Sequence, residues 1–204
     1  NFETVTFNVT DGSQTINPID ATVTIVGNNN AASYDGAEHT VSGYTATADT
    51  ELFDVTKDIT FSGTATAART NAGTTNMGLA SNQFANANGN FDKVTFVVTD
   101  GYVTVNPIDA TVTIVGANAT ADYDGKVHTI SGYTAEASNA LYHVSEDFTF
   151  NGTASATRTD AGTTNMGLAA SQFANTNGNF RTVTFNVTDG YSPCLVINNS
   201  ITSL

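Results

Sequence analysis

The chain is poor in cysteine, in positive charge and in long apolar runs. Cys194 is the single cysteine in 204 residues, and Lys and Arg together number six against nineteen Asp and Glu. One cysteine excludes a disulfide framework within the chain. A formal net charge of −13 repels phosphate backbones and anionic lipid surfaces, so neither nucleic-acid binding nor membrane-surface binding is expected. No apolar run approaches the roughly 18 residues of a membrane span, which argues against membrane insertion.

The N-terminus carries neither a methionine nor a leader pattern. The chain begins at Asn1, and no charged stretch followed by an apolar run precedes the first strand pattern. A cysteine-poor, threonine-rich composition is compatible with an exported bacterial protein. We therefore expect a piece of a longer exported protein, with any signal peptide outside it.

What the chain does contain is a tandem repeat. The segments Phe2–Gly12, Phe91–Gly101 and Phe180–Gly190 read FETVTFNVTDG, FDKVTFVVTDG and FRTVTFNVTDG, which sets a period of 89 residues. Residues 17–102 align without a gap with residues 106–191. Roughly two positions in three are identical, as in tandem arrays. The repeat predicts two domains of the same fold.

Each copy ends on an alternating apolar pattern followed by Asp-Gly. Asp100-Gly101 predicts a type I′ turn that joins two strands of a hairpin, because that turn needs positive φ at both central positions. Residues 1–17 then read as the closing hairpin of a preceding copy, loosely ordered or docked on a neighbouring molecule. Pro107 follows the hairpin directly and predicts a short, stiff domain junction.

These boundaries predict repeat domains at 18–106 and 107–196. Residues 197–204 depart from the repeat and are expected to be an added tail, with a natural terminus as the alternative. Within the first copy we predict one strand over residues 59–67 and a short helical turn over residues 80–86, capped by Ser81. The expected fold is mainly β: two tandem antiparallel sandwich-like domains, each with one short helix, in an elongated arrangement.

Asp35, His39 and Ser42 contain the residue types of a hydrolase triad, and they recur as Asp124, His128 and Ser131. Residues three apart on a strand face opposite sides, so His39 and Ser42 diverge where a triad needs them in contact. We predict instead a structural histidine bonded to the turn aspartate. The chain is not expected to be an enzyme.

For the other repeated polar residues, we weigh a structural role against a ligand-binding role. Arg69 and Arg158 are the only basic residues that recur, and each is expected to pair with a carboxylate or to bind loop carbonyls, with anion binding as the alternative. Asp20 and Asp109 near the junctions are candidate oxygen ligands for a calcium ion between domains. No other cofactor is expected.

Repeated tyrosines form the one candidate ligand surface. Aromatic faces stack on sugars, although the same rings also serve in packing. The candidate platform comprises Tyr34, Tyr44, Tyr123 and Tyr133, accompanied by Tyr102 and Tyr191.

The repeated words NPIDATVTIVG, YDG-x-x-HT, RT-[ND]-AGTTNMGL and VTF-x-VTDGY resemble the tandem stalk repeats of large bacterial cell-surface proteins, of the Ig-like and mucin-binding-protein-associated (MBG) type. The resemblance implies an extracellular, wall-attached protein whose repeats project an adhesive domain, and it supplies no catalytic residues. We therefore expect a monomeric stalk or spacer. The alternative is a module that binds host glycans or glycoproteins.

Overall fold

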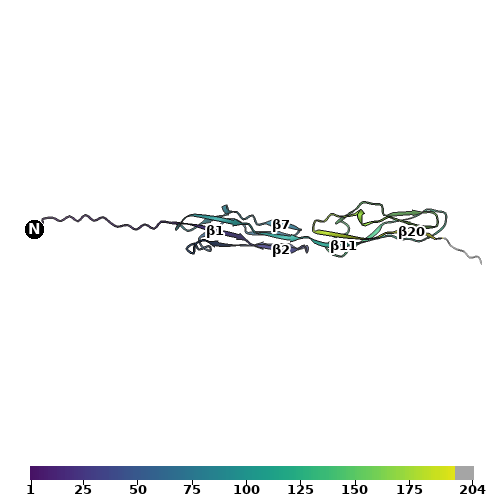
Figure 1. The fold of residues 1–204 in the computed structure, drawn as a ribbon, viewed down its shortest axis with the longest axis horizontal. Coiled ribbons are helices and arrows are strands. Elements are labelled where there is room, and N and C mark those ends of the chain that lie inside the picture. Colours follow the sequence, from purple (N-terminus) through teal and green to yellow (C-terminus); the bar gives the residue numbers. More distant parts are fainter. Residues whose placement is uncertain (196–204) are drawn as a thin grey trace, which may run out of the picture. The chain divides into compact units, whose positions relative to one another are not determined.

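The computed structural model describes residues 1–195, and these form a mainly β protein of two repeated domains (Figure 1). The helical structure described is limited to two single turns of 3₁₀ helix. Threonine, valine, isoleucine and aromatic residues dominate the strands, as their preference for a pleated, half-buried surface predicts.

The first repeat has ten strands and one 3₁₀ turn. In chain order they are β1 (Ile19–Gly27), β2 (Asn29–Ser33), β3 (His39–Ser42), β4 (Tyr44–Ala48), β5 (Ile59–Phe61), β6 (Thr66–Arg69), β7 (Gly73–Asn76), η1 (Ser81–Gln83), β8 (Phe84–Asn86), β9 (Phe91–Thr99) and β10 (Tyr102–Asn106).

The second repeat follows the same order. Its elements are β11 (Ile108–Gly116), β12 (Ala121–Asp122), β13 (His128–Ser131), β14 (Tyr133–Ala137), β15 (Phe148–Phe150), β16 (Ser155–Arg158), β17 (Gly162–Asn165), η2 (Ala170–Gln172), β18 (Phe173–Asn175), β19 (Phe180–Thr188) and β20 (Tyr191–Leu195).

Both repeats use the same sheets. The first has three-stranded sheets ordered β4-β1-β9 and β2-β10-β7, with the pairs β3-β6 and β5-β8. The second has β14-β11-β19 and β12-β20-β17, with β13-β16 and β15-β18. The period in the sequence is therefore a period in topology.

The central strand of each repeat has one antiparallel and one parallel neighbour. Val23 of β1 lies opposite Ala48 of the antiparallel β4 and opposite Phe96 of the parallel β9. A parallel pair needs a long crossover connection, which the chain between β1 and β9 supplies. The sheets around β1 and β11 are thus mixed, where the sequence patterns predicted antiparallel pairing alone. The pairs β5-β8, β13-β16 and β15-β18 are antiparallel as predicted.

The central strands also carry the core. In β1, Ala21, Val23 and Ile25 are buried on one face, packed with aromatic residues that include Phe84 and Phe91. The second repeat buries the corresponding side chains of β11 in the same way. The alternation of buried and exposed residues along β1 follows from the two-residue period of a strand.

The predicted hairpin over residues 91–106 is wrong. Strands β9 and β10 do not pair with each other: β9 joins β1, whereas β10 lies between β2 and β7 in another sheet. Among the described residues, positive φ occurs only at certain glycines, and Gly101 is not one of them. Asp100-Gly101 is therefore a passage from one sheet to the next and not a type I′ turn.

The Asp100 carboxylate and the Gly101 backbone serve this passage. Asp100 accepts hydrogen bonds from the amides of Gly78 and Leu79, at 3.0 and 2.9 Å. The backbone of Gly101 lies against that of Gly27, and a Cβ on Gly101 would come within 2.5 Å of the Asn28 carbonyl oxygen. Two strands can pass this closely only where a side chain is missing.

The strand predicted over residues 59–67 is divided, and the predicted helical turn is shorter. Strand β5 ends at Phe61 and β6 begins at Thr66, with different partners. The helical turn spans only Ser81–Gln83, and Ala80 precedes it as the capping position, not Ser81. The Gln83 side chain accepts the Ala80 amide at 2.8 Å, which closes the turn. The chain then extends because Phe84 enters the core.

Residues 1–18 form no strand, and all of them are exposed. Phe2, Phe7 and Val9 are 94%, 83% and 87% exposed. Their counterparts in β9 pair with β1 of the same repeat, and β1 in this chain already has β4 and β9 on its two sides. The interpretation as part of a preceding copy stays a prediction, and the tail 197–204 lies outside the described residues.

The compact units do not coincide with the repeats. One unit contains residues 1–29, 40–67 and 75–102. The other contains residues 30–39, 68–74 and 103 onward, so it joins the whole second repeat to three segments of the first. We call residues 30–39, 68–74 and 103–106 the end region of repeat 1. The boundary predicted at Pro107 remains a prediction, although only this residue separates β10 from β11.

Candidate functional site: the joint between the repeats

The Asp-His pair has the same geometry in both repeats. Asp35 Oδ1 lies 2.9 Å from His39 Nε2 and accepts the Ala37 amide at 2.9 Å. Asp124 repeats both contacts with His128 and the Lys126 amide. The Ala37 amide, followed by His39, lowers the pKa of the Asp35 carboxyl. Each aspartate holds its own Asp-Gly turn to the following strand.

The serine of the apparent triad lies elsewhere. Burial alternates along β3, with His39 half-buried and Ser42 exposed. The Ser42 carbonyl oxygen accepts a hydrogen bond from Asn28 Nδ2 at 2.8 Å. His39 and Ser42 thus project from opposite faces of β3, as the spacing predicted. The bond between Asp35 and His39 holds the turn that precedes this strand.

The repeated arginines bind loop carbonyls. Arg69 donates from Nε to the Asn71 oxygen and from Nη2 to the Ala72 oxygen, both at 2.7 Å. Arg158 donates from Nη2 to the Ala161 oxygen at 2.7 Å. The planar guanidinium reaches several acceptors at once, so each arginine shapes the loop that follows its strand. This is one of the two structural roles that the sequence predicted.

The tyrosines occupy unlike environments. Tyr44 packs edge-on against Phe61 and Phe84, and Tyr133 against Phe150 and Phe173. Tyr34 is half-buried, whereas Tyr123 is 55% exposed. Tyr102 and Tyr191 are as exposed as each other, at 40% and 42%, and less exposed than Tyr123. Their role as a ligand platform stays a prediction, with Tyr123 the most accessible ring.

The junction aspartates bind protein donors. Asp109 pairs with Arg181 at 2.9 Å and accepts the Thr182 amide at 3.1 Å, and Asp20 accepts the Lys93 amide at 3.2 Å. Among residues 1–195, no group of three or more His, Cys, Asp or Glu side chains is placed to hold a metal ion. Calcium at the junction therefore gains no support from this geometry.

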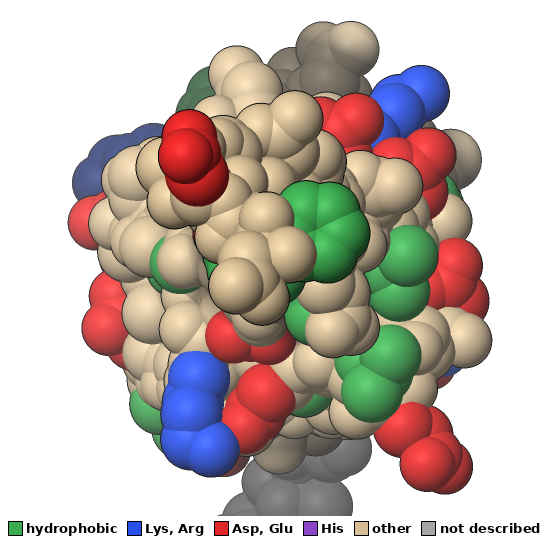
Figure 2. Space-filling view, turned by 90° about the vertical axis from the view of Figure 1, so that its left-hand side faces the viewer, with side chains coloured by type: hydrophobic (Ala, Val, Ile, Leu, Met, Phe, Trp, Pro, Cys, Tyr) green, Lys and Arg blue, Asp and Glu red, His purple; other side chains and the backbone are tan. Residues whose placement is uncertain are grey.

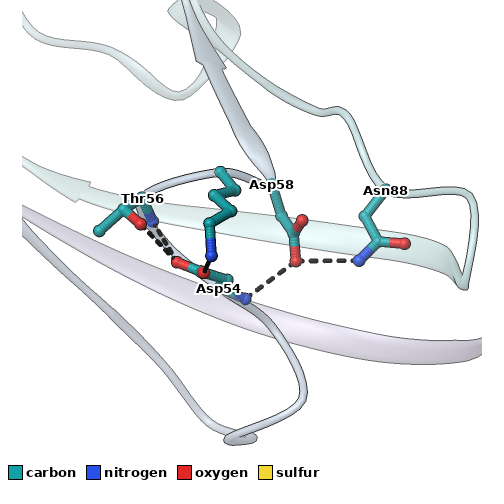
Figure 3. A network of polar contacts seen from close by, with 5 residues as sticks. Asp54, Thr56, Asp58 and Asn88 are labelled. Atoms are coloured by element: carbon teal, nitrogen blue, oxygen red, sulfur yellow. Dashed lines mark hydrogen bonds and ion pairs between the residues drawn. The ribbon is translucent and has the colours of Figure 1, made fainter.

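A polar network in the first repeat was not anticipated from the sequence (Figure 3). Asp54 binds Lys57 Nζ at 2.7 Å and the Thr56 hydroxyl at 2.6 Å, and Asp58 accepts the Asp54 amide and Asn88 Nδ2. Lys57 is the main cause that holds the pKa of Asp54 far below its usual value. Every carboxylate here binds a protein donor, so the network closes a loop.

The contacts that join the repeats lie within one compact unit. Asn179 Oδ1 accepts the Ala72 amide at 2.7 Å, and Asn179 Nδ2 donates to Asn71 Oδ1 at 3.1 Å. The Tyr34 ring meets the Phe180 ring edge-on, with centroids 6.0 Å apart. These contacts connect the end region of repeat 1 to the start of β19 in repeat 2.

The joint is assembled from parts already described. Arg69 shapes the loop that carries Asn71 and Ala72, and the turn held by Asp35 follows Tyr34 directly. On the other side, Phe180 packs against the buried Tyr142 at 4.9 Å between ring centroids, and burial raises the pKa of Tyr142 to about 12. The repeated polar residues therefore position the surfaces that meet.

Sequence reasoning did not identify Asn71, Ala72 or Asn179 as partners. The signal available was weak: Asn179 belongs to the repeated word NGNF, and Asn90 occupies the same place in the first copy. Asn179 is half-buried and Asn90 is exposed, but most positions recur between the copies, so recurrence alone did not identify this asparagine as a partner.

Charged side chains elsewhere are dispersed. On the face shown in Figure 2, acidic side chains lie at several places, some of them next to one another and next to a basic side chain. Lys57, Lys126 and Arg181 each lie within 4.0 Å of an aspartate. Exposed pairs of this kind add little stability, and the net negative charge favours solubility.

Fold and joint together define a class: a mainly β protein of tandem repeats whose copies contact one another. Comparison of the chain with protein-family models, with curated proteins and with solved structures found no match. In the described part of the chain, no helix has the length and apolar character needed to cross a membrane.

Proposed function

We propose that this chain is a non-catalytic structural repeat, a stalk or spacer, of an exported bacterial cell-surface protein that projects an adhesive domain from the cell wall. The proposal depends mainly on the joint. The end region of repeat 1 folds in one compact unit with repeat 2, held by Asn179 and by Tyr34 on Phe180. Consecutive repeats are therefore coupled by side-chain contacts as well as by the chain.

Coupling of this kind suits a spacer. A junction of one proline between two strands has little conformational freedom. Contacts on both sides of Pro107 restrict it further, so that each added copy contributes a defined step. In repeat proteins, stability and length both grow through such nearest-neighbour interfaces.

The repeated words support the cellular setting. Their resemblance to Ig-like and MBG-type stalk repeats suggests a wall-attached protein, and the low cysteine content is compatible with export. Antibodies raised against residues 19–195 should label intact cells of the source bacterium. Labelling that requires lysed cells would remove the surface assignment.

Small-angle scattering tests the spacer role directly. We would compare the present chain with chains that carry one and two further copies of residues 18–106 at the start. A maximum dimension that increases by equal steps is expected. A dimension that stays nearly constant as copies are added would mean that the repeats collapse on one another, and the proposal would fail.

A glycan- or glycoprotein-binding module is the second candidate. The observation that favours it is the exposure of Tyr123, with Tyr102 and Tyr191 less exposed. A glycan array probed with the intact chain and with Tyr123→Ala tests this role. Binding lost in the variant would support it, and an array without signal would oppose it.

A further inference from the structure

The start of repeat 1 carries a depression of about 470 Å³. Its lining includes Ile19, Leu52, Asn90 and Phe91, together with Ile16 and Pro18 of the segment before β1. Phe91 is only 5% exposed, so the accessible apolar surface is that of Ile19 and Leu52. Leu52 is 72% exposed and Ile19 46% exposed, which is unusual for large aliphatic side chains grouped around one hollow. We call Ile19, Leu52, Asn90 and Phe91 the receiving surface.

The same surface exists a second time, and there it is covered. The counterparts of the receiving surface 89 residues later are Ile108, Leu141, Asn179 and Phe180. All four are half-buried or buried.

The covering residues come from the end region of repeat 1. Tyr34 meets Phe180, Asn71 and Ala72 bind Asn179, and a Cβ on Gly36 would lie 3.2 Å from Leu141 Cδ2. Their own counterparts in repeat 2 are Tyr123, Gly125, Asp160 and Ala161. We call these four residues the projecting surface.

Within residues 1–195, no residue packs on the projecting surface as Phe180, Leu141 and Asn179 pack on its counterpart in repeat 1. Tyr123 is 55% exposed where Tyr34 is half-buried. Arg158 binds the Ala161 oxygen at 2.7 Å, as Arg69 binds that of Ala72. The two loops share this bond, whereas Arg158 Nε lacks, within the described chain, the partner that Arg69 Nε finds in the Asn71 oxygen.

We propose that the receiving surface binds the projecting surface of a second copy of this chain. Tyr123 of one copy packs on the exposed Leu52 of the other, at the edge of the buried Phe91. Asn90 accepts the Ala161 amide and donates to Asp160, as Asn179 does with Ala72 and Asn71. Asp160 is a stronger hydrogen-bond acceptor than its counterpart Asn71, because a carboxylate replaces an amide oxygen.

Such an association is head-to-tail. The two surfaces differ, so each bound copy leaves one free surface of each kind, and the assembly grows without closing unless a ring forms. At the joint within the chain, the covalent link supplies an effective concentration on the order of millimolar. Separate molecules lack this link, so association is weak and appears only in concentrated solution.

Sedimentation equilibrium of the full chain tests the proposal, with reductant present because the chain contains a cysteine. The weight-average mass should rise as the concentration increases from about 10 µM to about 1 mM, the range in which linked modules gain from their link. A constant monomer mass over this range would overturn the proposal.

A pair of variants identifies the surfaces. Asn90→Asp places a carboxylate against Asp160 and should weaken association at least about tenfold, because like charges across an interface are costly. Asp160→Asn alone should weaken association only modestly, because an amide oxygen accepts the same bond at the joint, although less strongly than a carboxylate. The double variant restores an amide-carboxylate pair and should recover most of the association. Since the Asn90 side chain is exposed, each variant is expected to fold, which circular dichroism would verify.

Association that is unaffected by Asn90→Asp, or that the double variant does not recover, would assign self-association to another surface and overturn the proposal. The inference deepens the proposed spacer role and rests on it for biological meaning. A negative result here leaves that role standing, since it needs only the joint within the chain. Equal steps in the scattering series test that role separately.

Discussion

Gly27 and Gly101 cross with their backbones in contact, and Gly116 and Gly190 do so in the second repeat. Neither residue of the pair needs a left-handed conformation. Each is glycine because any Cβ would collide with main-chain atoms of the other strand, which cannot move aside as a side-chain end can.

Replacing Gly101 by alanine should therefore be costly. Gly101→Ala brings a Cβ to 2.5 Å from the Asn28 oxygen and 2.8 Å from Met77 Sδ, and overpacking of this kind costs about 2 kcal/mol or more. Gly89→Ala is the matched control, because nothing lies within 4 Å of its Cβ, and it should stay within about 0.5 kcal/mol. Urea denaturation measures both, and equal costs would contradict the close crossing.

The turn aspartates should make the fold sensitive to acid. The folded-state pKa of Asp35, Asp109 and Asp124 is lowered from 3.8. Ionised carboxylates thus stabilise the fold fully above about pH 4, and this contribution is lost as the pH falls below 3.8 through the folded pKa.

The thermal midpoint should accordingly change little from neutral pH to about pH 4 and then decline. The double variant Asp35→Asn/Asp124→Asn should decline less steeply over the acidic range, because two of the groups that gain protons on unfolding are gone. A slope equal to that of the natural chain would mean that these two bonds do not contribute.

Strand β1 shows how one element depends on partners far away in the chain. It pairs with β4 on one side and, in parallel, with β9 on the other. Because both sides are occupied, a missing amide anywhere along its middle leaves a gap in a ladder.

Thr24→Pro tests this central position. The Thr24 side chain is exposed, so the substitution removes a backbone donor without disturbing the core. The free energy of unfolding should fall by about 3 kcal/mol or more. Thr24→Val keeps the amide and the branched shape and should remain within about 0.5 kcal/mol. Guanidinium denaturation of both variants gives the comparison.

The arginine loops offer a second test at this scale. Arg69→Lys and Arg158→Lys each replace a planar fork with a single ammonium, which cannot hold several carbonyls at once. A loss of about 1.5 to 3 kcal/mol is expected for either. Arg69→Lys should cost more, because its loop also binds Asn179. Equal losses would show that the joint does not depend on the loop shape.

At the scale of the whole molecule, the repeats support each other through Tyr34. Tyr34→Ala removes the ring that packs edge-on against Phe180 and should lower the stability of the second repeat by about 1 to 2 kcal/mol. Tyr123→Ala is the matched control, since its ring is 55% exposed, and it should cost less. Dilute samples keep the comparison free of self-association. Equal effects in dilute solution would argue against coupling of the repeats.

Much of the fold was predictable because its signals are local. The 89-residue period predicted two domains of one topology, and the alternation in residues 19–27 and 91–99 predicted strands with one buried face. The Asp35–His39 bond was also predictable, because the two residues are only four positions apart. A turn followed directly by a strand keeps such residues close in space.

The failures came where distant backbone decided the outcome. Asp100-Gly101 has the composition of a hairpin turn, yet β9 finds its partner in β1, more than 60 residues earlier. The predicted strand over residues 59–67 divides because β5 and β6 belong to different pairs. Asn71 and Asn179 meet across 108 residues, a distance at which no pattern in the chain indicates a partner.

The amino-acid sequence by itself determined the repeat and the β character, because period and alternation act over a few neighbouring residues. Only the tertiary structure decided which strands pair, that they do so partly in parallel, and that the end of one repeat packs on the start of the next. Those outcomes depend on which surfaces remain to be covered once the chain is compact.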